Sequence, residues 1–250
     1  MTEWFNPKYG NTPFGEKYTE EFNLPEERNI QEVNSIEKII KKYFPLKPKV
    51  LDLAGGFGRI GKPLQDRLLV SNLLVDFDLN LKFLRMAQQS RIQNVVQGDM
   101  RKLPFTAESF DLILLMFTSF GYFPTQEEDK QVLHETYRTL TRDGQFLMDL
   151  PNFHRITQYF LPARELKLAN GGTIKYTKKI EEGVLIEERI ITNSQRESTT
   201  LAPLKLRIYL KEDIQAICNK TGFKKIELTD ENLNYFNPKF SKRMWVRCKK

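Results

Sequence analysis

The sequence predicts an α/β protein with a mostly parallel sheet, and three observations support this. Between residues 29 and 150, short apolar segments of strand length alternate with amphipathic segments of helix length, as in βαβ units with right-handed crossovers. The first apolar segment runs into a glycine-rich turn at residues 55–58. After residue 163 the pattern changes to β-branched segments separated by short glycine turns, which indicates antiparallel hairpins.

The composition is that of a folded domain. The 250 residues are 40% hydrophobic and 28% charged, which indicates one large domain, or a domain with an insertion. The longest apolar run, Leu112–Phe117, has six residues, whereas a membrane-spanning helix needs about 20. The N-terminus does not have the pattern of a secretory signal. The two cysteines, Cys218 and Cys248, are too few and too far apart for a zinc site, so we expect a cytoplasmic protein with reduced thiols, no metal and no membrane partner.

The first half contains the strands and helices from which the parallel sheet is inferred. The helix at 29–44 has apolar residues three and four positions apart and ends at Pro45. The strand at 110–117 is apolar throughout, as expected for a strand buried on both faces. The other expected elements are strands at 49–54, 73–77, 95–97 and 145–150 and helices at 60–69, 79–91 and 127–140, with a turn at 142–144 before the last strand.

The second half is expected to contain an antiparallel insertion, after which the core pattern resumes. The predicted strands of the insertion are 166–169, 173–180, 184–192 and 204–209, with turns at 170–172 and 181–183. A helix at 211–221, closed by Gly222, and strands at 224–228 and 244–248 complete a seven-stranded mixed sheet. The predicted division is an N-terminal aromatic arm at 1–28, a core at 29–163 and 210–250, and an insertion at 164–209.

The sharpest chemical signal is the turn after the first strand, Asp52-Leu53-Ala54-Gly55-Gly56-Phe57-Gly58. Glycines let the backbone approach a ligand closely, and the N-terminus of the next helix favours an anionic group. Asp78 ends the second strand about twenty residues later, where a carboxylate accepts hydrogen bonds from ribose hydroxyls. These residues predict that an adenosine-like ligand lies across the carboxyl ends of the strands.

Two ligand classes fit such a turn. Residues 56–61 satisfy the pattern G-x-G-x-x-G, so a nicotinamide oxidoreductase is one alternative. S-adenosylmethionine is favoured because Asp52 lies inside the first strand, where a buried acid suits the ammonium of an amino-acid tail and has no role against a pyrophosphate. Asp99 follows the third strand and is placed to accept from an adenine amino group, while Met100 can pack on the ring. The fourth strand leads into a loop of small and aromatic residues, 117–123, at the same edge of the sheet.

From about Tyr9 to its end, the chain resembles the class I S-adenosylmethionine-dependent methyltransferases, which have a Rossmann-like fold with helices on both faces of the sheet. Their first loop, D/E-x-G-x-G-x-G, is matched by Asp52, Gly56 and Gly58, and Ala54 replaces the first glycine. An alanine fits this turn if its φ is negative. The resemblance implies S-adenosylmethionine as cofactor. The residues expected to contact it are Tyr9, Tyr18, Asp52, Ala54, Gly55, Gly56, Gly58, Phe77, Asp78, Leu79, Gly98, Asp99, Met100, Phe117 and Thr118.

The arm, the loop at 118–123 and the insertion resemble a subgroup that acts on small molecules, and sugar-amine N-methyltransferases share this layout. The expected reaction is in-line transfer of a methyl group to a nitrogen or oxygen, for which positioning is the main requirement. An alcohol acceptor needs a general base and a deprotonated amine does not, and His154, Tyr122 and Tyr209 are the candidates. The arm and the insertion are predicted to close over the cofactor as a lid. The residues expected at the acceptor are Phe120, Tyr122, Asn152, His154, Arg207 and Tyr209.

The net charge of +7 permits an anionic partner. Six basic residues and no acid occupy positions 239–250, and we expect a solvated basic end there, because few aromatic residues interleave with the charges. Methylation of RNA or protein is a second functional alternative, and a cofactor-binding sensor without catalysis is another. The expected partner is a small-molecule acceptor rather than nucleic acid, and the chain is expected to be a monomer or a homodimer.

Overall fold

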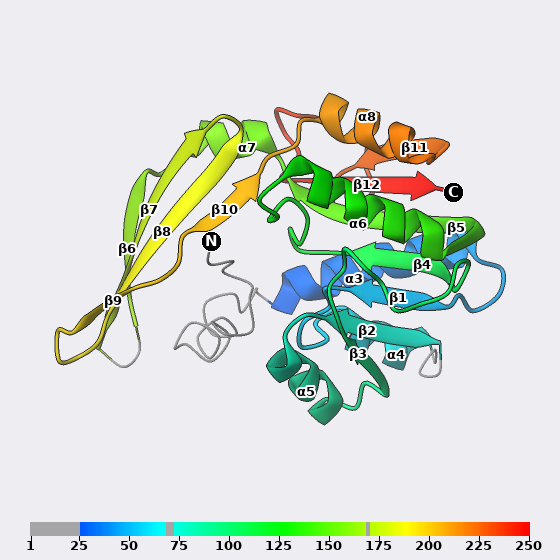
Figure 1. Ribbon diagram of the computed structural model, residues 1–250, viewed down its shortest axis with the longest axis horizontal. Coiled ribbons are helices and arrows are strands. Elements are labelled where there is room, and N and C mark those ends of the chain that lie inside the picture. The colour runs from blue at the N-terminus through cyan, green and yellow to red at the C-terminus, as the bar shows by residue number, and fades with distance from the viewer. Residues whose placement is uncertain (1–25, 69–72, 169–170) are drawn as a thin grey trace.

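A computed structural model describes residues 26–68, 73–168 and 171–250 (Figure 1). Its larger sheet has seven strands in the order β11-β12-β5-β4-β1-β2-β3. The predicted α/β fold, with a seven-stranded mixed sheet and an antiparallel insertion, is confirmed. The strands of this sheet are β1 (Val50–Leu53), β2 (Leu74–Asp78), β3 (Asn94–Gln97), β4 (Phe110–Leu115), β5 (Leu140–Pro151), β11 (Lys225–Thr229) and β12 (Arg243–Lys249).

The first five strands are parallel, and the last two are antiparallel to their neighbours. β1 pairs in parallel with β2 and β4, and β4 pairs in parallel with β5. β12 runs antiparallel to β5, with Arg243 opposite Pro151. The carboxyl ends of β1, β2, β4 and β5 therefore share one edge of the sheet with the beginning of β12, so the last strand starts where a ligand of this fold class binds.

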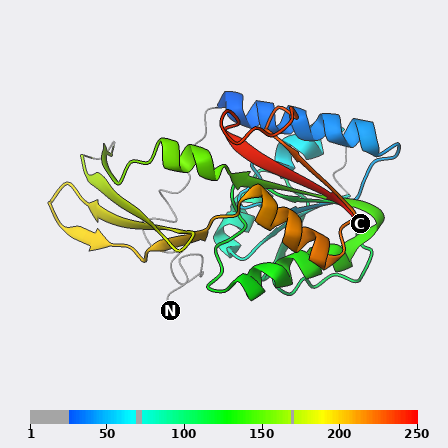
Figure 2. The ribbon, with the colours of Figure 1, turned by 90° about the horizontal axis from the view of Figure 1, so that it is seen from above.

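Helices cover both faces of the sheet, as predicted. α3 (Glu26–Tyr43) and α4 (Gly61–Leu68) lie on one face, and α6 (Gln126–Thr139) and α8 (Lys211–Thr221) lie on the other (Figure 2). Each layer encloses its own apolar cluster. Val33, Leu64 and Trp245 belong to the first cluster, and Leu133, Ile214 and Val246 belong to the second. Because β12 contributes Trp245 to one face and Val246 to the other, the alternation along this strand ties the two cores together.

Local sequence signals explain where the helices begin. Thr125 caps α6, since its hydroxyl accepts from the Glu128 N–H while the Glu128 carboxylate accepts from the Thr125 N–H, a capping box. α5 (Leu81–Gln89) begins at Asn80, whose side chain accepts from the Lys82 N–H at 2.9 Å. α8 ends at Gly222, which adopts the left-handed conformation at φ 114°.

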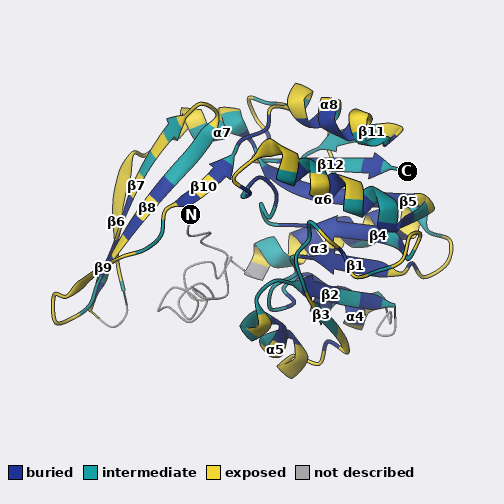
Figure 3. Ribbon diagram, in the orientation of Figure 1, coloured by how far each residue is buried: buried dark blue, intermediate teal, exposed yellow. Residues whose placement is uncertain are grey.

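The insertion forms a second, antiparallel sheet on the side of the carboxyl ends (Figure 1). Its strands pair in the order β10-β8-β7-β6, and β9 pairs with β8. Figure 3 shows exposed residues along β6 and alternating burial along β7. The strands are β6 (Ala163–Lys167), β7 (Thr173–Glu181), β8 (Val184–Thr192), β9 (Ser198–Thr200) and β10 (Leu204–Arg207).

Several local expectations are corrected by the structure. The expected turn at 142–144 is an irregularity within β5, because Phe110 pairs with Leu140 while Leu112 pairs with Gln145. A short helix, α7 (Phe153–Gln158), and strand β9 were not anticipated. Both lack strong periodicity: α7 spans less than two turns, and β9 is a polar strand paired only on one side.

The expectation that the basic residues at 239–250 are solvated is wrong for Arg243 and Arg247. Arg243 and Arg247 have side-chain exposures of only 17% and 12%, because β12 lies inside the sheet. Arg247 donates to the Tyr43 hydroxyl at 2.9 Å and to Gln145 Oε1 at 2.7 Å. The sequence gives no sign of this pairing, since the partners are about 100 or more residues away along the chain.

Cys218 and Cys248 are buried free thiols. In the described ranges, no helix combines the length and the apolar character that crossing a bilayer requires. Residues 1–25 of the predicted aromatic arm, including Tyr9 and Tyr18, lie outside the described residues, and residues 26–28 belong to α3 rather than to the arm.

Candidate active site

The glycine turn follows β1 and faces the carboxyl edge of the sheet. Ala54, Gly56 and Gly58 have φ values of 56°, 66° and 84°. The negative φ under which an alanine would fit this turn is therefore not observed, and Ala54 occupies the left-handed region that favours glycine. The Gly55 N–H donates to the Phe77 carbonyl at 3.2 Å, which fixes the turn against the end of β2. Among the residues that the structure describes, nothing lies within 4 Å of a Cβ built on Gly56, so they leave the space in front of this residue open.

Asp78, the last residue of β2, bonds to the glycine turn that follows β1. Its Oδ2 accepts from the Gly56 N–H at 3.0 Å, and its Oδ1 accepts from the Asn80 N–H at 2.7 Å. Burial raises the pKa of Asp78 to about 6, although these backbone N–H groups lower it in part. The carboxylate is thus oriented by the turn on one side and by the start of α5 on the other, where it can accept from a ligand's hydroxyl groups.

A second carboxyl pair lies directly behind the turn. Asp52 and Asp76 face each other across β1 and β2 and are 1% and 0% exposed. A Cβ on Gly55 would come within 2.4 Å of Asp76 Oδ1 and 2.9 Å of the Asp52 carboxyl carbon, so only glycine fits at position 55. Burial and the neighbouring Asp52 and Asp78 charges raise the pKa of Asp76. Burial also raises the pKa of Asp52, in part against the Arg59 charge and the Gly61 N–H.

Asp76 was not predicted as a site residue, although a carboxylate between apolar residues of a buried strand was a usable signal. Among the described residues, Asp52 Oδ2 and both carboxylate oxygens of Asp76 have no hydrogen-bond partner. Buried polar atoms without partners are rare in folded proteins and indicate a strained or functional place. This row of acids suits a cationic ligand and opposes a pyrophosphate.

Asp99, the acid expected to bind adenine, follows β3 in the sequence and is held by Arg101. Arg101 Nε donates to both carboxylate oxygens of Asp99, at 3.1 and 3.0 Å, and Arg101 Nη1 donates to Glu128 Oε1 at 2.5 Å. Although partial burial opposes it, the Arg101 hydrogen bonds hold the pKa of Asp99 below its usual value. Gly98 donates its N–H to the Asp78 carbonyl at 3.0 Å, so the loop that carries Asp99 is fixed to the end of β2.

The loop after β4 brings Phe117 and Thr118 to the same edge. Both residues are left-handed, with φ of 59° and 62°. Their N–H groups donate to Asp149 on β5, from Phe117 to Oδ2 and from Thr118 to the backbone carbonyl, each at 3.1 Å. Asp149 is itself paired with Arg243. Neither Asp149 nor Arg243 was predicted from the sequence as a partner of this loop.

Two of the expected acceptor residues contact a buried acid instead of an open space. The Tyr209 hydroxyl donates to Asp129 Oδ2 at 2.7 Å, and Arg207 Nε donates to the same oxygen at 3.1 Å. Asp129 lies in the first turn of α6 and is 0% exposed. The Phe120 ring lies 5.3 Å from the Tyr209 ring. These contacts attach the end of the insertion to the core beside the loop after β4.

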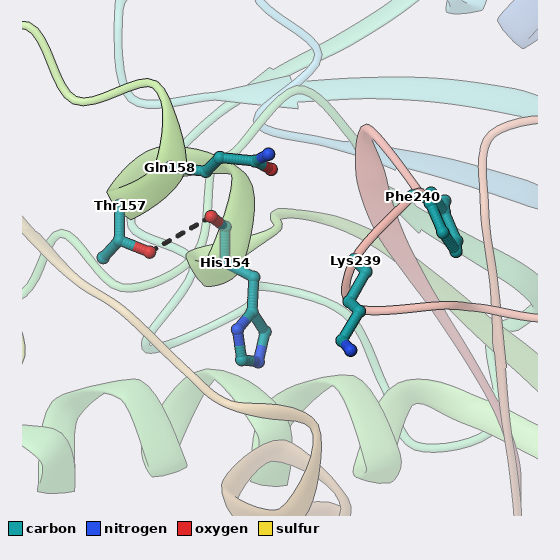
Figure 4. Close-up of a pocket in the computed structure, with 5 residues that line it drawn as sticks. All are labelled: His154, Thr157, Gln158, Lys239 and Phe240. Atoms are coloured by element: carbon teal, nitrogen blue, oxygen red, sulfur yellow. Dashed lines mark hydrogen bonds between the residues drawn. The ribbon is translucent and has the colours of Figure 1, made fainter.

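The remaining expected acceptor residues differ in exposure. Asn152 is buried; its amide donates to the carbonyls of Pro238 and Ser241 at 2.8 and 2.7 Å, and its Oδ1 accepts from the His154 N–H. His154 itself lines an open pocket with Thr157, Gln158, Lys239 and Phe240 (Figure 4). Tyr122 is half-buried in the loop before α6.

The residues at this edge fit S-adenosylmethionine. Gly55 makes room for the acid pair, Gly56 has open space in front of it among the described residues, and Asp78 presents a half-buried carboxylate. The ligand would bring a sulfonium and an ammonium, whose positive charges favour the ionised form of buried acids that lack partners. A dinucleotide would instead place two phosphates against the same acids.

Comparison with known proteins agrees with this assignment. A family model described as a methyltransferase domain matches residues 50–144. The ubiquinone/menaquinone biosynthesis C-methyltransferase UbiE of Xanthomonas campestris is 35% identical over 124 residues, which are 44% of this chain and 47% of that protein. The chain thus spans about half the length of the curated relatives that it matches.

Solved structures resemble the chain over more of its length. An S-adenosylmethionine-dependent methyltransferase from Clostridium acetobutylicum has a TM-score of 0.75 at 17% identity and covers 88% of this chain and 91% of its own. CalS10 from Micromonospora echinaspora, an amino pentose methyltransferase solved with bound S-adenosylmethionine, has a TM-score of 0.66 at 15% identity and covers 88% and 90%. At these identities the likeness concerns the fold, while the family match covers the strands and turns that form the site. Residues 50–144 therefore match a methyltransferase-domain family, and the chain is similar in fold to S-adenosylmethionine-dependent methyltransferases.

Proposed function

We propose that this protein transfers a methyl group from S-adenosylmethionine to a nitrogen or oxygen of a small molecule by in-line displacement. The observation that carries the proposal is the Asp78 carboxylate, which is bonded to the Gly56 N–H at 3.0 Å beside the open space of the glycine turn. The small-molecule class is supported by the insertion at the carboxyl edge and by the likeness to an amino pentose methyltransferase.

In this proposal the protein mainly binds and orients. Asp78 accepts from the ribose hydroxyls, the glycine turn and Asp52 hold the amino-acid tail, and Asp99 with Met100 holds the adenine. When bound, the cofactor supplies a methyl group that its sulfonium already activates. The loop at Phe117–Thr118 borders the acceptor, and holding the acceptor in line with the methyl group contributes roughly 7–11 kcal/mol to such reactions.

The insertion at 164–209 is assigned the role of a substrate lid. The Asp129 contacts of Arg207 and Tyr209 support this role, because they hold β10 next to the loop that follows β4. The aromatic arm remains a predicted part of the lid. Removing residues 1–20 should weaken cofactor binding if the arm covers the cofactor, and unchanged affinity would argue against such a role.

The cofactor assignment is tested by calorimetric titration with S-adenosylhomocysteine, S-adenosylmethionine and NADH. We expect micromolar binding of the first two and no binding of NADH. Asp78→Asn should weaken binding by about tenfold or more, since a hydrogen bond to a charged group contributes about 1.5–3 kcal/mol. Asp66→Asn, at an exposed aspartate on α4, is the matched control and should bind normally. Binding of NADH alone would refute the methyltransferase assignment.

The acceptor atom is tested by incubating small amines, sugars, alcohols and quinols with labelled cofactor and identifying the products by mass spectrometry. His154→Ala should abolish transfer to an alcohol if His154 is the base, and should leave transfer to a deprotonated amine intact. Methylation of carbon, as named for the relative from Xanthomonas campestris, would refute the nitrogen or oxygen assignment and preserve the cofactor assignment. Cofactor binding without any product would favour a sensor.

A further inference from the structure

The loop that follows β4 has an unfavourable backbone. Phe117 and Thr118 are consecutive residues with positive φ, at 59° and 62°, and neither is glycine. Residues with side chains avoid this region unless the surroundings hold them there, and such places are frequent at functional sites. The loop is at the carboxyl edge, between the glycine turn and the start of α6.

A buried ion pair holds this loop from the side of β5 and β12. Asp149 is 0% exposed and accepts from Arg243 through two parallel bonds, Nε to Oδ1 and Nη2 to Oδ2, both 2.8 Å. Asp149 Oδ2 also accepts from the Phe117 N–H, and the Asp149 carbonyl accepts from the Thr118 N–H. Arg243 Nη2 donates further to the Thr118 hydroxyl. Both left-handed residues are thus bonded to the same pair.

Two other cations lie over the Phe117 ring of this loop. The Arg59 guanidinium, directly after the glycine turn, lies 4.9 Å from the centre of the Phe117 ring, and that of Arg28 lies 5.6 Å from it. Both arginines pair with Glu32 of α3, which is 1% exposed. The loop therefore contacts both Arg59, directly after the glycine turn, and the Asp149–Arg243 pair.

The arrangement of β12 does not by itself require this ion pair. The β5–β12 pairing continues from Arg243 opposite Pro151 to Lys249 opposite Gln145 through the backbone. Buried ion pairs contribute little net stability, because desolvation of the two charges offsets their attraction. What the pair adds is a rigid, bidentate orientation of the groups that bond to the loop.

We propose that Arg243 is a positioning residue for methyl transfer: through Asp149 and Thr118 it holds the Phe117–Thr118 loop in the left-handed form against which the cofactor and the acceptor meet. This inference rests on the proposed function. Arg243 is far from the glycine turn in the sequence, and its effect on the ligands passes through the loop.

Arg247 offers a matched control on the same strand. The Arg247 side chain is similarly buried, with 12% exposure against 17% for Arg243, and it pairs with Glu227. It lies four residues further along β12, away from the loop. We would compare Arg243→Gln, Arg243→Lys and Arg247→Gln. The measurements are the affinity for S-adenosylhomocysteine by calorimetry, hydrogen exchange of the Phe117 and Thr118 amides, and the midpoint of thermal unfolding.

We expect Arg243→Gln to weaken S-adenosylhomocysteine binding at least tenfold and to speed exchange of the two amides at least tenfold. Arg243→Lys keeps the charge without the bidentate geometry, so it should restore part of both properties. Arg247→Gln should lower the unfolding midpoint and leave both properties unchanged. If Arg243→Gln does not fold, Arg243→Lys is compared with Arg247→Lys. We then expect an at least threefold change in S-adenosylhomocysteine affinity and in exchange of the two amides only for the variant at position 243.

Wild-type affinity and exchange in the Arg243 variants would overturn the inference, as would equal effects of the Arg247 variants. Failure of the proposed function gives a different result, because the wild-type protein would then not bind S-adenosylhomocysteine. In that case, faster exchange of the Phe117 and Thr118 amides in the Arg243 variants alone would still support the inference that Arg243 holds the loop. Unchanged exchange would refute it.

Discussion

Ala54 has a backbone conformation that its side chain disfavours. Its φ is 56°, and left-handed geometry costs a residue with a Cβ roughly 1–2 kcal/mol. Ala54→Gly removes this cost but gives the unfolded chain more freedom, so we expect a net gain of about 0.5–1 kcal/mol in the free energy of unfolding. Urea denaturation measures it. Ala87→Gly, inside the helix α5, should be destabilising, and a loss of stability in Ala54→Gly would contradict the strain at this turn.

Asp76 gives the protein a pH dependence of definite sign. Burial and the charges of Asp52 and Asp78 raise its pKa in the folded protein, whereas an aspartate in the unfolded chain ionises near 4. Above that pH the folded state binds the extra proton, so rising pH lowers the free energy of unfolding until the folded pKa is passed.

The substitution Asp76→Asn removes this titration and keeps the shape of the side chain. The stability of the variant relative to wild type should therefore increase between pH 5.5 and 8, by up to about 1.4 kcal/mol per pH unit. Denaturation in urea at several pH values measures the difference. The exposed Asp66→Asn variant should show a nearly constant difference, and a constant difference for Asp76→Asn would mean that its carboxyl group is not perturbed.

At the scale of elements, the attachment of β10 to α6 depends on Asp129. Burial raises the pKa of this carboxyl to about 6, against the lowering effect of the Tyr209 hydroxyl and the Arg207 charge. Tyr209→Phe removes one donor from a buried carboxylate and should reduce the free energy of unfolding by about 1–3 kcal/mol.

If Tyr209 only anchors β10, Tyr209→Phe should leave turnover per folded molecule within a few fold of wild type. If Tyr209 were the general base, turnover would fall far more than stability. Tyr235→Phe, at a position 86% exposed, is the control for loss of a phenol hydroxyl. Turnover with an identified acceptor and thermal unfolding separate the two roles.

The core elements were predictable, because their signals are local. Continuous apolar runs predicted strands such as β4, and Gly222 correctly marked the end of α8. The short helix α7 was missed because its helical state depends on Asn152, which caps it while its amide binds the carbonyls of Pro238 and Ser241. Such a contact between distant segments has no signature in the local sequence.

For the whole molecule, ligand binding should raise stability by mass action. At a free S-adenosylhomocysteine concentration of 100 times its dissociation constant, the gain is about 2.7 kcal/mol, or roughly 5–10 °C in the unfolding midpoint of a domain of this size. NADH at the same concentration should give no shift. Differential scanning calorimetry measures both, and a shift with NADH alone would contradict a site lined by buried acids.

The sequence by itself determined the order of the core strands and helices, the place of the glycine turn, and the positions of Asp52, Asp78 and Asp99 in or just after the first three strands. Periodicity and turn chemistry act over a few residues, and the carboxyl ends of parallel strands meet at one edge in any such sheet.

Only the tertiary structure decided which charged groups meet at that edge. The contacts of Asp149 with Arg243 and of Asp129 with Tyr209, and the burial of Asp76, all depend on segments that are far apart in the sequence and meet in the fold. An ionisable group is stable in the interior only beside a partner or in its neutral form. The partners come from parts of the chain that only folding brings together.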